Sequence, residues 1–177
     1  EKDGEVVIKA AGDVWLTDER LDDLAEQIKA KAVDVKRVSI DTSVWSGPDQ
    51  APGWDDDNID GGYVAPIQPA MLYGGRLGDK TGDVPRSHEP ALNVARALAG
   101  RLGTDKADMA TAPAGAESLA STDSDPLAVR AQEAAKDSDN VMAEAIAREV
   151  ALSQHQEASF EGAAQATLDV LQGHGFD

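Results

Sequence analysis

Residues 6–40 read VVIKAAGDVWLTDERLDDLAEQIKAKAVDVKRVSI, and this stretch decides the fold class of the chain. The apolar run Val6-Val7-Ile8 predicts a short buried strand, and residues 35–40 predict a second strand. A helix is predicted to begin after Thr17, because a threonine at the N-cap position precedes an acidic first turn that suits the helix dipole. Its apolar residues recur at helical spacing and are Leu21, Leu24, Ala25 and Ile28. A strand, a helix and a strand in succession indicate a mixed α/β fold.

Residues 41–90 have a different composition. They hold six of the eight prolines and two of the three tryptophans, with weak periodicity. A segment this long that predicts neither helix nor strand inside a compact domain is usually functional, or it contains elements that the pattern does not reveal. Both alternatives stay open for residues 41–90.

The second half of the sequence predicts mostly helices. Pro90 favours the first turn of a helix that Gly103 ends. Residues 104–123 form a connection rich in Ala, Thr, Ser and Asp, with room for one short strand. Three further helices are predicted at about 125–136, 139–153 and 160–172.

The composition narrows the classes of partner. Lys plus Arg number 16 and Asp plus Glu number 33, which gives a net charge of −17. Nucleic acid and anionic membrane surfaces require a basic face, so neither is expected as a partner. The chain has no cysteine, which excludes disulfides, a Cys nucleophile and Cys-bound zinc. No apolar run approaches the roughly 18–20 residues of a transmembrane helix, and no cofactor is predicted.

Ser138-Asp139-Asn140 is the short motif that bears most directly on function. It opens the predicted helix over 139–153, and a hydroxyl and an amide two residues apart can both face one cleft. Ser is also a common helix N-cap residue, so capping by Ser138 is the structural alternative to a catalytic role.

Further short motifs precede this one in a fixed order. A predicted strand ends at Asp41, and an exposed aromatic residue is expected after it at Trp45. The structural alternative is that Trp45 and Trp54 are packing residues that anchor the loop to the body. The loop then carries Ala51-Pro52-Gly53-Trp54 and Tyr63-Val64-Ala65-Pro66. With Ser138-Asp139-Asn140 after them, these motifs make the chain resemble the low-molecular-mass class C penicillin-binding proteins. These are the serine-type D-alanyl-D-alanine carboxypeptidases and endopeptidases of peptidoglycan.

The resemblance implies two structural parts. Residues 1–110 would form an accessory α/β domain inserted between the catalytic motifs. Residues 111–177 would form part of the helical half of a β-lactamase/transpeptidase-like domain, and they carry Ser138-Asp139-Asn140. The implied location is extracytoplasmic, in the periplasm or cell wall. Glu1–Glu5 do not resemble a signal peptide, so the residues alone leave two alternatives, a cytoplasmic protein or a signal that has been removed, and the resemblance implies the second.

The resemblance also implies a reaction and two site residues. The family removes the terminal D-Ala of peptidoglycan peptides through an acyl-enzyme, so the implied partners are peptides that end in D-Ala-D-Ala, and β-lactams. Ser138 would relay a proton between the general-base lysine and the leaving amine. Asn140 would hydrogen-bond that lysine and the substrate amide. No metal is implied.

The sequence departs from the family at the other two catalytic motifs. None of its lysines has a serine three residues before it, so Ser-x-x-Lys is missing. Lys80-Thr81-Gly82 precedes Ser138, whereas the Lys-Thr-Gly of the family follows that position. It also lies between Gly78 and Pro85 rather than in a predicted strand. We therefore expect a middle fragment of a carboxypeptidase that is inert as the isolated chain.

The last three predicted helices carry apolar faces that need cover. The remaining parts of the parent chain, or a second copy in a homo-oligomer, would pack against them. Without that cover we expect dimerisation or poor stability. The residues that define these faces are Leu127, Met142, Ile146, Val150, Leu168 and Leu171.

A function of another class is also open. The chain could be a non-enzymatic acidic binding module in which the Trp/Pro/Gly-rich loop 41–69 is the ligand surface. Asp56, Asn58 and Asp60 fit the first half of a calcium loop, but Ile67 stands where a bidentate Glu is needed, which favours a solvated acidic turn. The histidines have neither metal-ligand spacing nor an obvious partner and are His88, His155 and His174.

Overall fold

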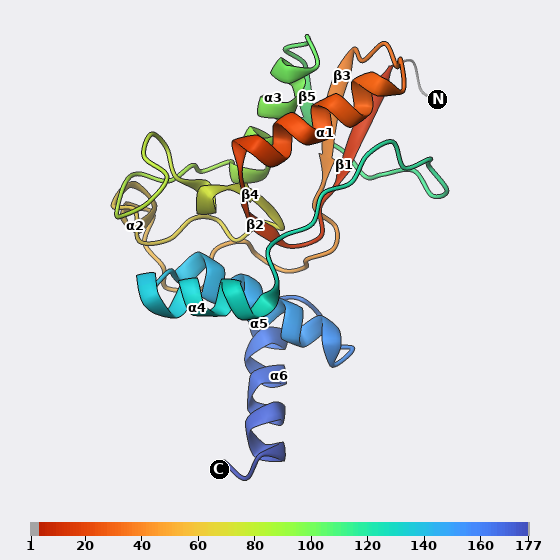
Figure 1. Ribbon diagram of the computed structural model, residues 1–177. Helices are drawn as coiled ribbons and strands as arrows, with labels where there is room; N and C mark the ends of the chain where they lie inside the picture. The colour runs from red at the N-terminus through yellow and green to blue at the C-terminus, as the bar shows by residue number, and fades with distance from the viewer. Residues whose placement is uncertain (1–3, 177) are drawn as a thin grey trace.

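The computed structural model describes residues 4–176, in which short strands alternate with helices (Figure 1). The strands are β1 (Glu5–Lys9), β2 (Asp13–Leu16), β3 (Arg37–Asp41), β4 (Ala70–Leu72) and β5 (Ala107–Met109). The helices are α1 (Asp18–Ala30), α2 (Asp57–Asp60), α3 (Pro90–Arg101), α4 (Leu127–Asp137), α5 (Asn140–Ser153) and α6 (Phe160–Gly173), with a 3-10 turn η1 at Tyr73–Gly75.

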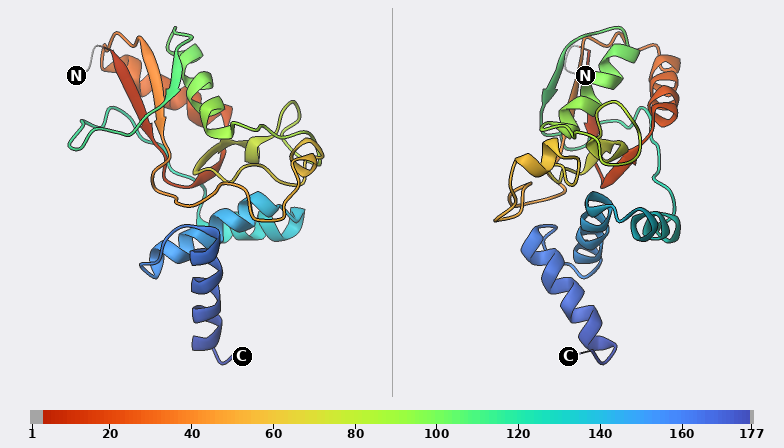
Figure 2. Two further views of the ribbon diagram at one scale, coloured as in Figure 1. Left: turned by 180° about the vertical axis from the view of Figure 1, so that it is seen from behind. Right: turned by 90° about the vertical axis from the view of Figure 1, so that its left-hand side faces the viewer.

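Three strands form a parallel sheet in the order β1-β3-β5. Parallel neighbours need a crossover connection, and α1 and α3 lie in the two crossovers. These helices contact each other on one face of the sheet, as Figures 1 and 2 show. α1 begins where predicted, because the Thr17 hydroxyl accepts a hydrogen bond from the Arg20 amide at 3.3 Å. The α/β class expected from residues 6–40 is therefore confirmed.

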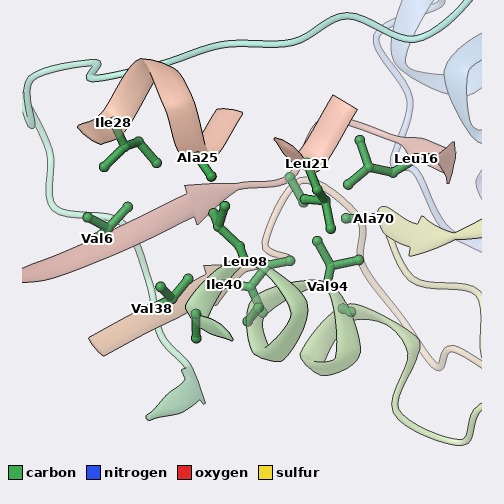
Figure 3. Packing of buried hydrophobic residues seen from close by; sticks show 14 residues of the cluster. Val6, Leu16, Leu21, Ala25, Ile28, Val38, Ile40, Ala70, Val94 and Leu98 are labelled. Atoms are coloured by element: carbon green, nitrogen blue, oxygen red, sulfur yellow. The ribbon is translucent and has the colours of Figure 1, made fainter. Parts of the chain in front are cut away.

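The first core cluster lies between this sheet and its two helices (Figure 3). Strand residues enter it from one side, and α1 and α3 supply aliphatic side chains from the other. Burial of each large aliphatic side chain stabilises a fold by about 1.5–3 kcal/mol, so a core forms here without aromatic residues. The larger members of the cluster are Val6, Leu16, Leu21, Ile28, Val38, Ile40, Val94 and Leu98.

A second core cluster joins the middle of the chain to the C-terminal helices. The parallel pair of β2 and β4 and the loop after β3 contribute to it from one side, and α5 from the other. Its buried members are Val14, Trp45, Ala65, Ile67, Met71, Val141, Met142, Ala145 and Ala158. The cluster therefore includes residues from both sides of the predicted boundary between 1–110 and 111–177.

The three C-terminal helices are covered unequally. α5 contacts both α4 and α6, whereas α6 extends away from the body of the molecule (Figures 1 and 2). Three of the predicted face residues are exposed, namely Leu127, Leu168 and Leu171. The other three differ from the expectation because they are buried or half-buried against neighbouring elements, and they are Met142, Ile146 and Val150. Among the described residues, no helix has both the length and the apolar composition that a membrane crossing requires.

Several short elements show no pattern in the sequence. β2 and β4 have four and three residues, too few for alternation to be recognised. α2 is a single turn at the acidic segment. η1 places Tyr73 at φ 49° and Gly74 at φ 66°, the left-handed region that glycine adopts without strain. The loop predicted over 41–90 therefore contains short ordered elements that direct it across the second core cluster.

Candidate functional site

Ser138-Asp139-Asn140 forms the junction between α4 and α5. α4 ends at Asp137, and Ser138 adopts a left-handed backbone with φ 52° and ψ 39°, which is uncommon for a residue other than glycine. Asp139 is the N-cap of α5, because its Oδ1 accepts a hydrogen bond from the Met142 amide at 2.8 Å. The structural alternative of capping by Ser138 is therefore wrong, since the next residue caps the helix.

The three residues of the junction alternate in burial. Asp139 is only 5% exposed, whereas Ser138 and Asn140 are exposed. The Asn140 side-chain amide donates to the Tyr63 carbonyl oxygen at 3.0 Å, so the loop after α2 reaches the junction. A hydroxyl and an amide on the outside, with a carboxylate inside, suit the roles predicted for Ser138 and Asn140. Those roles stay predictions.

Two arginines surround the buried carboxylate. Asp139 Oδ2 lies 2.9 Å from Arg76 Nη2 and 3.3 Å from Arg86 Nη2. Burial alone would raise the pKa of Asp139, but the Met142 amide and the two guanidinium groups outweigh it and hold that pKa below its ordinary value. The carboxylate is therefore ionised, and its contacts with the arginines are charge-assisted hydrogen bonds.

Arg86 is the most deeply buried of these charged groups, at 2% exposure. It donates from Nε to the Gly62 carbonyl at 2.8 Å and from Nη1 to the Gly74 carbonyl at 2.9 Å. A Cβ atom on Gly74 would come within 2.8 Å of Arg86 Nη1, so glycine permits this close approach. Burial lowers the pKa of the Arg86 guanidinium, and the charge of Asp139 opposes that change.

A cavity of about 530 Å³ lies beside the junction. Arg76 stacks on the Trp15 ring at 4.9 Å from the ring centroid, and both side chains line the cavity. Ser138 and Asn140 do not line it. Its remaining lining residues are Thr81, Gly82, Asp83, Glu133, Ala134, Lys136, Asp137, Asp139 and Met142. The cavity is thus bounded by Arg76 and Asp139 on one side and by charged side chains from α4 on the other.

A second cavity, of about 250 Å³, is lined by Trp45, Ile67 and Arg148 among others. Arg148 lies between two aromatic rings, 5.1 Å from the Trp45 centroid and 4.5 Å from the Phe160 centroid. Burial raises the pKa of Glu144, and its partner Arg148, with Nε at 3.4 Å, opposes that change. Glu144 therefore forms an ion pair with a buried arginine.

The tryptophans of loop 41–69 pack inward. Trp45 is 8% exposed and belongs to the second core cluster, so the expectation of an exposed aromatic after Asp41 is wrong. Trp54 is half-buried and meets Phe160 edge-on, with ring centroids 5.6 Å apart. Because exposed aromatic rings are the usual anchors of a binding surface, a binding module built on this loop loses its main support.

The remaining motifs of the sequence lie in loops and in the single turn of α2. Lys80-Thr81-Gly82 lies in the loop between η1 and α3 rather than in a strand, as expected. His88 lies 3.0 Å from Asp60, so the expectation that it has no partner is wrong. The acidic residues at 56–60 form the N-cap and single turn of α2. Between residues 4 and 176, no three His, Cys, Asp or Glu side chains gather as metal ligands would.

Three residues of the site were not identified from the sequence, namely Asp139, Arg76 and Arg86. The motif Ser-x-Asn does not specify its middle residue, so it does not identify Asp139 as a site residue. The sequence indicates only that Asp is a favoured N-cap residue. The arginines precede it by 63 and 53 residues, in a glycine-rich loop without periodicity. No pattern in the sequence indicates that they approach the junction.

Comparison with known proteins places this geometry in context. The sequence profile of the D-Ala-D-Ala carboxypeptidase 3 (S13) family matches residues 1–91 and 76–177. Carboxypeptidase DacB of Mycolicibacterium smegmatis is 42% identical to this chain over an alignment of 189 residues. The alignment covers 98% of this chain and 41% of that protein. Carboxypeptidase Rv3627c of Mycobacterium tuberculosis is 44% identical over 182 residues, which cover 95% of this chain and 40% of that protein. The chain thus spans about two fifths of the length of these curated relatives.

Solved structures share the fold. The crystal structure of penicillin binding protein 4 (dacB) from Haemophilus influenzae matches with a TM-score of 0.76 and 20% identity, over 99% of this chain and 54% of that chain. A crystal structure of the same protein complexed with a novel beta-lactam matches with a TM-score of 0.59 and 19% identity. At these identities the likeness shows the fold alone, and it agrees with the α/β architecture described above.

Proposed function

Because the chain belongs to the D-Ala-D-Ala carboxypeptidase 3 (S13) family, we propose that it is part of a serine carboxypeptidase that removes the terminal D-Ala of peptidoglycan peptides. The complete enzyme, here called the longer protein, would supply the Ser-x-x-Lys and the strand Lys-Thr-Gly that residues 1–177 lack. The isolated chain would be inert, since acylation needs an activated nucleophile and an oxyanion hole.

One observation carries the proposal. In a chain that matches the family over its whole length, Ser138 and Asn140 are exposed on either side of the buried Asp139. Their polar groups are therefore available to a substrate and to the lysine of a neighbouring segment. The inward packing of Trp45 and Trp54 favours this enzyme over the binding module.

In the proposed reaction, the serine of Ser-x-x-Lys attacks the carbonyl carbon of the penultimate D-Ala. A C–O ester bond forms, the C–N amide bond breaks, and the terminal D-Ala leaves with its amine. Ser138 would pass a proton from the lysine to the leaving nitrogen, while Asn140 would hold the lysine and the substrate amide. Water then hydrolyses the ester and restores the free serine.

The proposal also includes a domain boundary within the chain and a cellular location for the longer protein. Residues 1–110 would be the accessory α/β domain, and residues 111–177 would belong to the transpeptidase-like domain. The first core cluster supports this division because its fully buried members all precede residue 110. The longer protein would react with β-lactams, as the complex of its structural relative suggests, and would act outside the cytoplasm, where peptidoglycan lies.

Peptide hydrolysis by the longer protein tests the proposal. We expect release of D-Ala from a peptide that ends in D-Ala-D-Ala, and a fall in kcat of about 10²–10³-fold in Ser138→Ala and in Asn140→Ala. Lys80→Ala is the control and should leave kcat unchanged, because the Lys80 side chain pairs with Asp18 and lies over the Tyr73 ring and does not line the cavity. Full activity in both site variants would contradict the roles assigned to them, and an inactive wild type would contradict the function.

A further inference from the structure

The ion cluster of Asp139, Arg76 and Arg86 carries an inference that rests on the proposed function and deepens it. We propose that Arg76 and Arg86, acting through Asp139, are positioning residues for the reaction. They fix the backbone between the two catalytic side chains, although neither arginine touches the substrate in this proposal.

Both carboxylate oxygens of Asp139 are engaged. Oδ1 accepts the Met142 amide at 2.8 Å, and Oδ2 lies within 3.3 Å of both arginines. The first contact determines where α5 begins, and the second attaches that point to the loop between β4 and α3. Because the middle residue of the motif is held inside, the first and third residues project outward.

The backbone at Ser138 depends on its surroundings. With φ 52° it occupies a region that a serine keeps only where neighbouring structure holds it. Asp139, which follows directly, provides that support through its buried contacts. Release of the carboxylate would therefore let the Ser138 hydroxyl leave the place from which it relays a proton.

The arginines are themselves immobilised. Each donates two hydrogen bonds to backbone carbonyl oxygens in addition to its contact with the carboxylate, at distances between 2.8 and 3.1 Å. Neither guanidinium can shift without breaking these bonds. The acceptors are Gly62 and Gly74 for Arg86, and Tyr73 and Gly82 for Arg76.

A second loop, between α2 and β4, also reaches the motif. Arg86 Nε binds the Gly62 carbonyl at 2.8 Å, and the Asn140 amide binds the next carbonyl, that of Tyr63, at 3.0 Å. A displaced Arg86 would thus disturb Asn140 both through Asp139 and through the backbone at residues 62 and 63. The two catalytic side chains are therefore coupled to one buried arginine.

Positioning and structural support differ in a measurable way. A merely structural cluster lowers the amount of folded protein but leaves the rate of each active molecule unchanged. A positioning cluster slows each active molecule, because a misplacement of about 1 Å caused by a remote change can lower a rate about 10²-fold. The acylation rate per active molecule is therefore the decisive quantity.

Acylation of the longer protein by benzylpenicillin provides that quantity. Adduct stoichiometry by intact-mass spectrometry gives the active fraction, and the time course gives the rate constant. We expect this rate constant to fall about 10- to 100-fold in Arg86→Gln and less in Arg76→Gln. Arg130→Gln is the matched control, because Arg130 is also buried and pairs with Glu149 of α5 at 2.9 Å. Its rate constant should stay at the wild-type value.

Two more variants keep the test decisive where Arg86→Gln does not fold. Asp139→Asn retains a favoured N-cap residue but loses the charge, so it should slow acylation to a similar degree. Arg86→Lys restores the charge without the second backbone contact and should give an intermediate rate constant.

The outcomes separate this inference from the function on which it rests. Wild-type rate constants in Asp139→Asn, Arg76→Gln and Arg86→Gln, whatever their adduct stoichiometry, would show a merely structural cluster and overturn the inference. A wild-type longer protein that forms no adduct would overturn the proposed function, and the inference with it.

Discussion

The sheet layer and the last helix bury their apolar side chains to different degrees. In the sheet layer, which comprises β1, β3, β5, α1 and α3, Leu21 and Leu98 are fully buried. On α6, Leu168 and Leu171 are 52% and 43% exposed, and every described residue from 167 onward is exposed. The sheet layer therefore closes its core together with Leu16 of β2 and Ala70 of β4, whereas α6 has apolar surface that nothing in the described chain covers.

The Asp139 cluster attaches the start of α5 to the loop between β4 and α3, so its removal should have the largest effect. Asp139→Ala deprives Arg76 and Arg86 of their carboxylate and removes the cap of α5. We expect the free energy of unfolding to fall by about 3–5 kcal/mol, measured by urea unfolding of the chain. Hydrogen exchange should show loss of protection in α4 and α5 before the strands of the sheet layer.

An exposed ion pair provides the control for this prediction. Glu89 and Arg96 lie 3.1 Å apart, and their side chains are 59% and 50% exposed, so Glu89→Ala should change the free energy of unfolding by only about 0–1 kcal/mol. Equal losses in the two variants would contradict the anchoring role of Asp139.

Leucine truncation measures the contrast between the two regions directly. Leu98→Ala opens a void in the first core cluster, so we expect a loss of about 2–5 kcal/mol in the free energy of unfolding. Leu168→Ala removes an exposed side chain from α6 and should change it by no more than about 0.5 kcal/mol. A comparable loss at Leu168 would mean that α6 is already covered in solution.

The pH dependence of stability should differ in sign between Asp139, which is buried, and Asp13, which is half-buried. The pKa of Asp139 lies below its ordinary value, so its ionised form stabilises the fold above the unfolded pKa of about 3.9, and that stabilisation is lost as the pH falls through the folded pKa. We therefore expect the stability difference between wild type and Asp139→Asn to be greatest near neutral pH and to shrink in acid.

Asp13 is the control for that sign. Burial raises its pKa, although the Trp15 amide and Arg20 oppose the change. Its contribution is present below the unfolded pKa of about 3.9 and is lost as the pH rises through the folded pKa. In urea unfolding over a pH series, the difference between wild type and Asp13→Asn should therefore change in the opposite direction. If both stability differences changed in the same direction with pH, the opposite pKa shifts assigned to Asp139 and Asp13 would be wrong.

The smallest effect on stability, and the clearest on association, is expected from α6. Replacing Leu168 and Leu171 by serine together removes the exposed apolar stripe without disturbing a core. We expect weaker self-association in sedimentation velocity and little change in the free energy of unfolding. Ala164→Ser, at another exposed position of α6, should leave association unchanged. An unaltered sedimentation coefficient in the double variant would show that the stripe does not mediate contacts.

Much of the fold could be predicted because its signals are local. The Thr17 cap, Pro90 in the first turn of α3, and apolar spacing along the C-terminal helices each depend on neighbouring residues. The pairing of β2 with β4 could not be predicted, since strands of four and three residues carry no recognisable alternation and meet across more than fifty residues of chain. The burial of Trp45 likewise depends on α5, which lies far along the chain.

The candidate site also combines residues that a local motif identifies with residues that only the folded chain brings together. Ser138 and Asn140 could be found because a short motif marks them. The ion cluster around Asp139 could not, because Arg76 and Arg86 meet it only after the loop between β4 and α3 folds onto the junction. The sequence therefore located the polar groups that face outward, and the structure shows what holds them in place.

The central claim is that this chain supplies the Ser-Asp-Asn part of a serine acyl-transferase whose nucleophile lies outside residues 1–177. Intact-mass spectrometry after incubation with benzylpenicillin tests it most directly, on the chain and on the longer protein side by side. We predict a stoichiometric adduct on the longer protein, at a serine outside residues 1–177, and no adduct on the chain alone. A stoichiometric adduct on any serine of residues 1–177, Ser138 included, would contradict the claim.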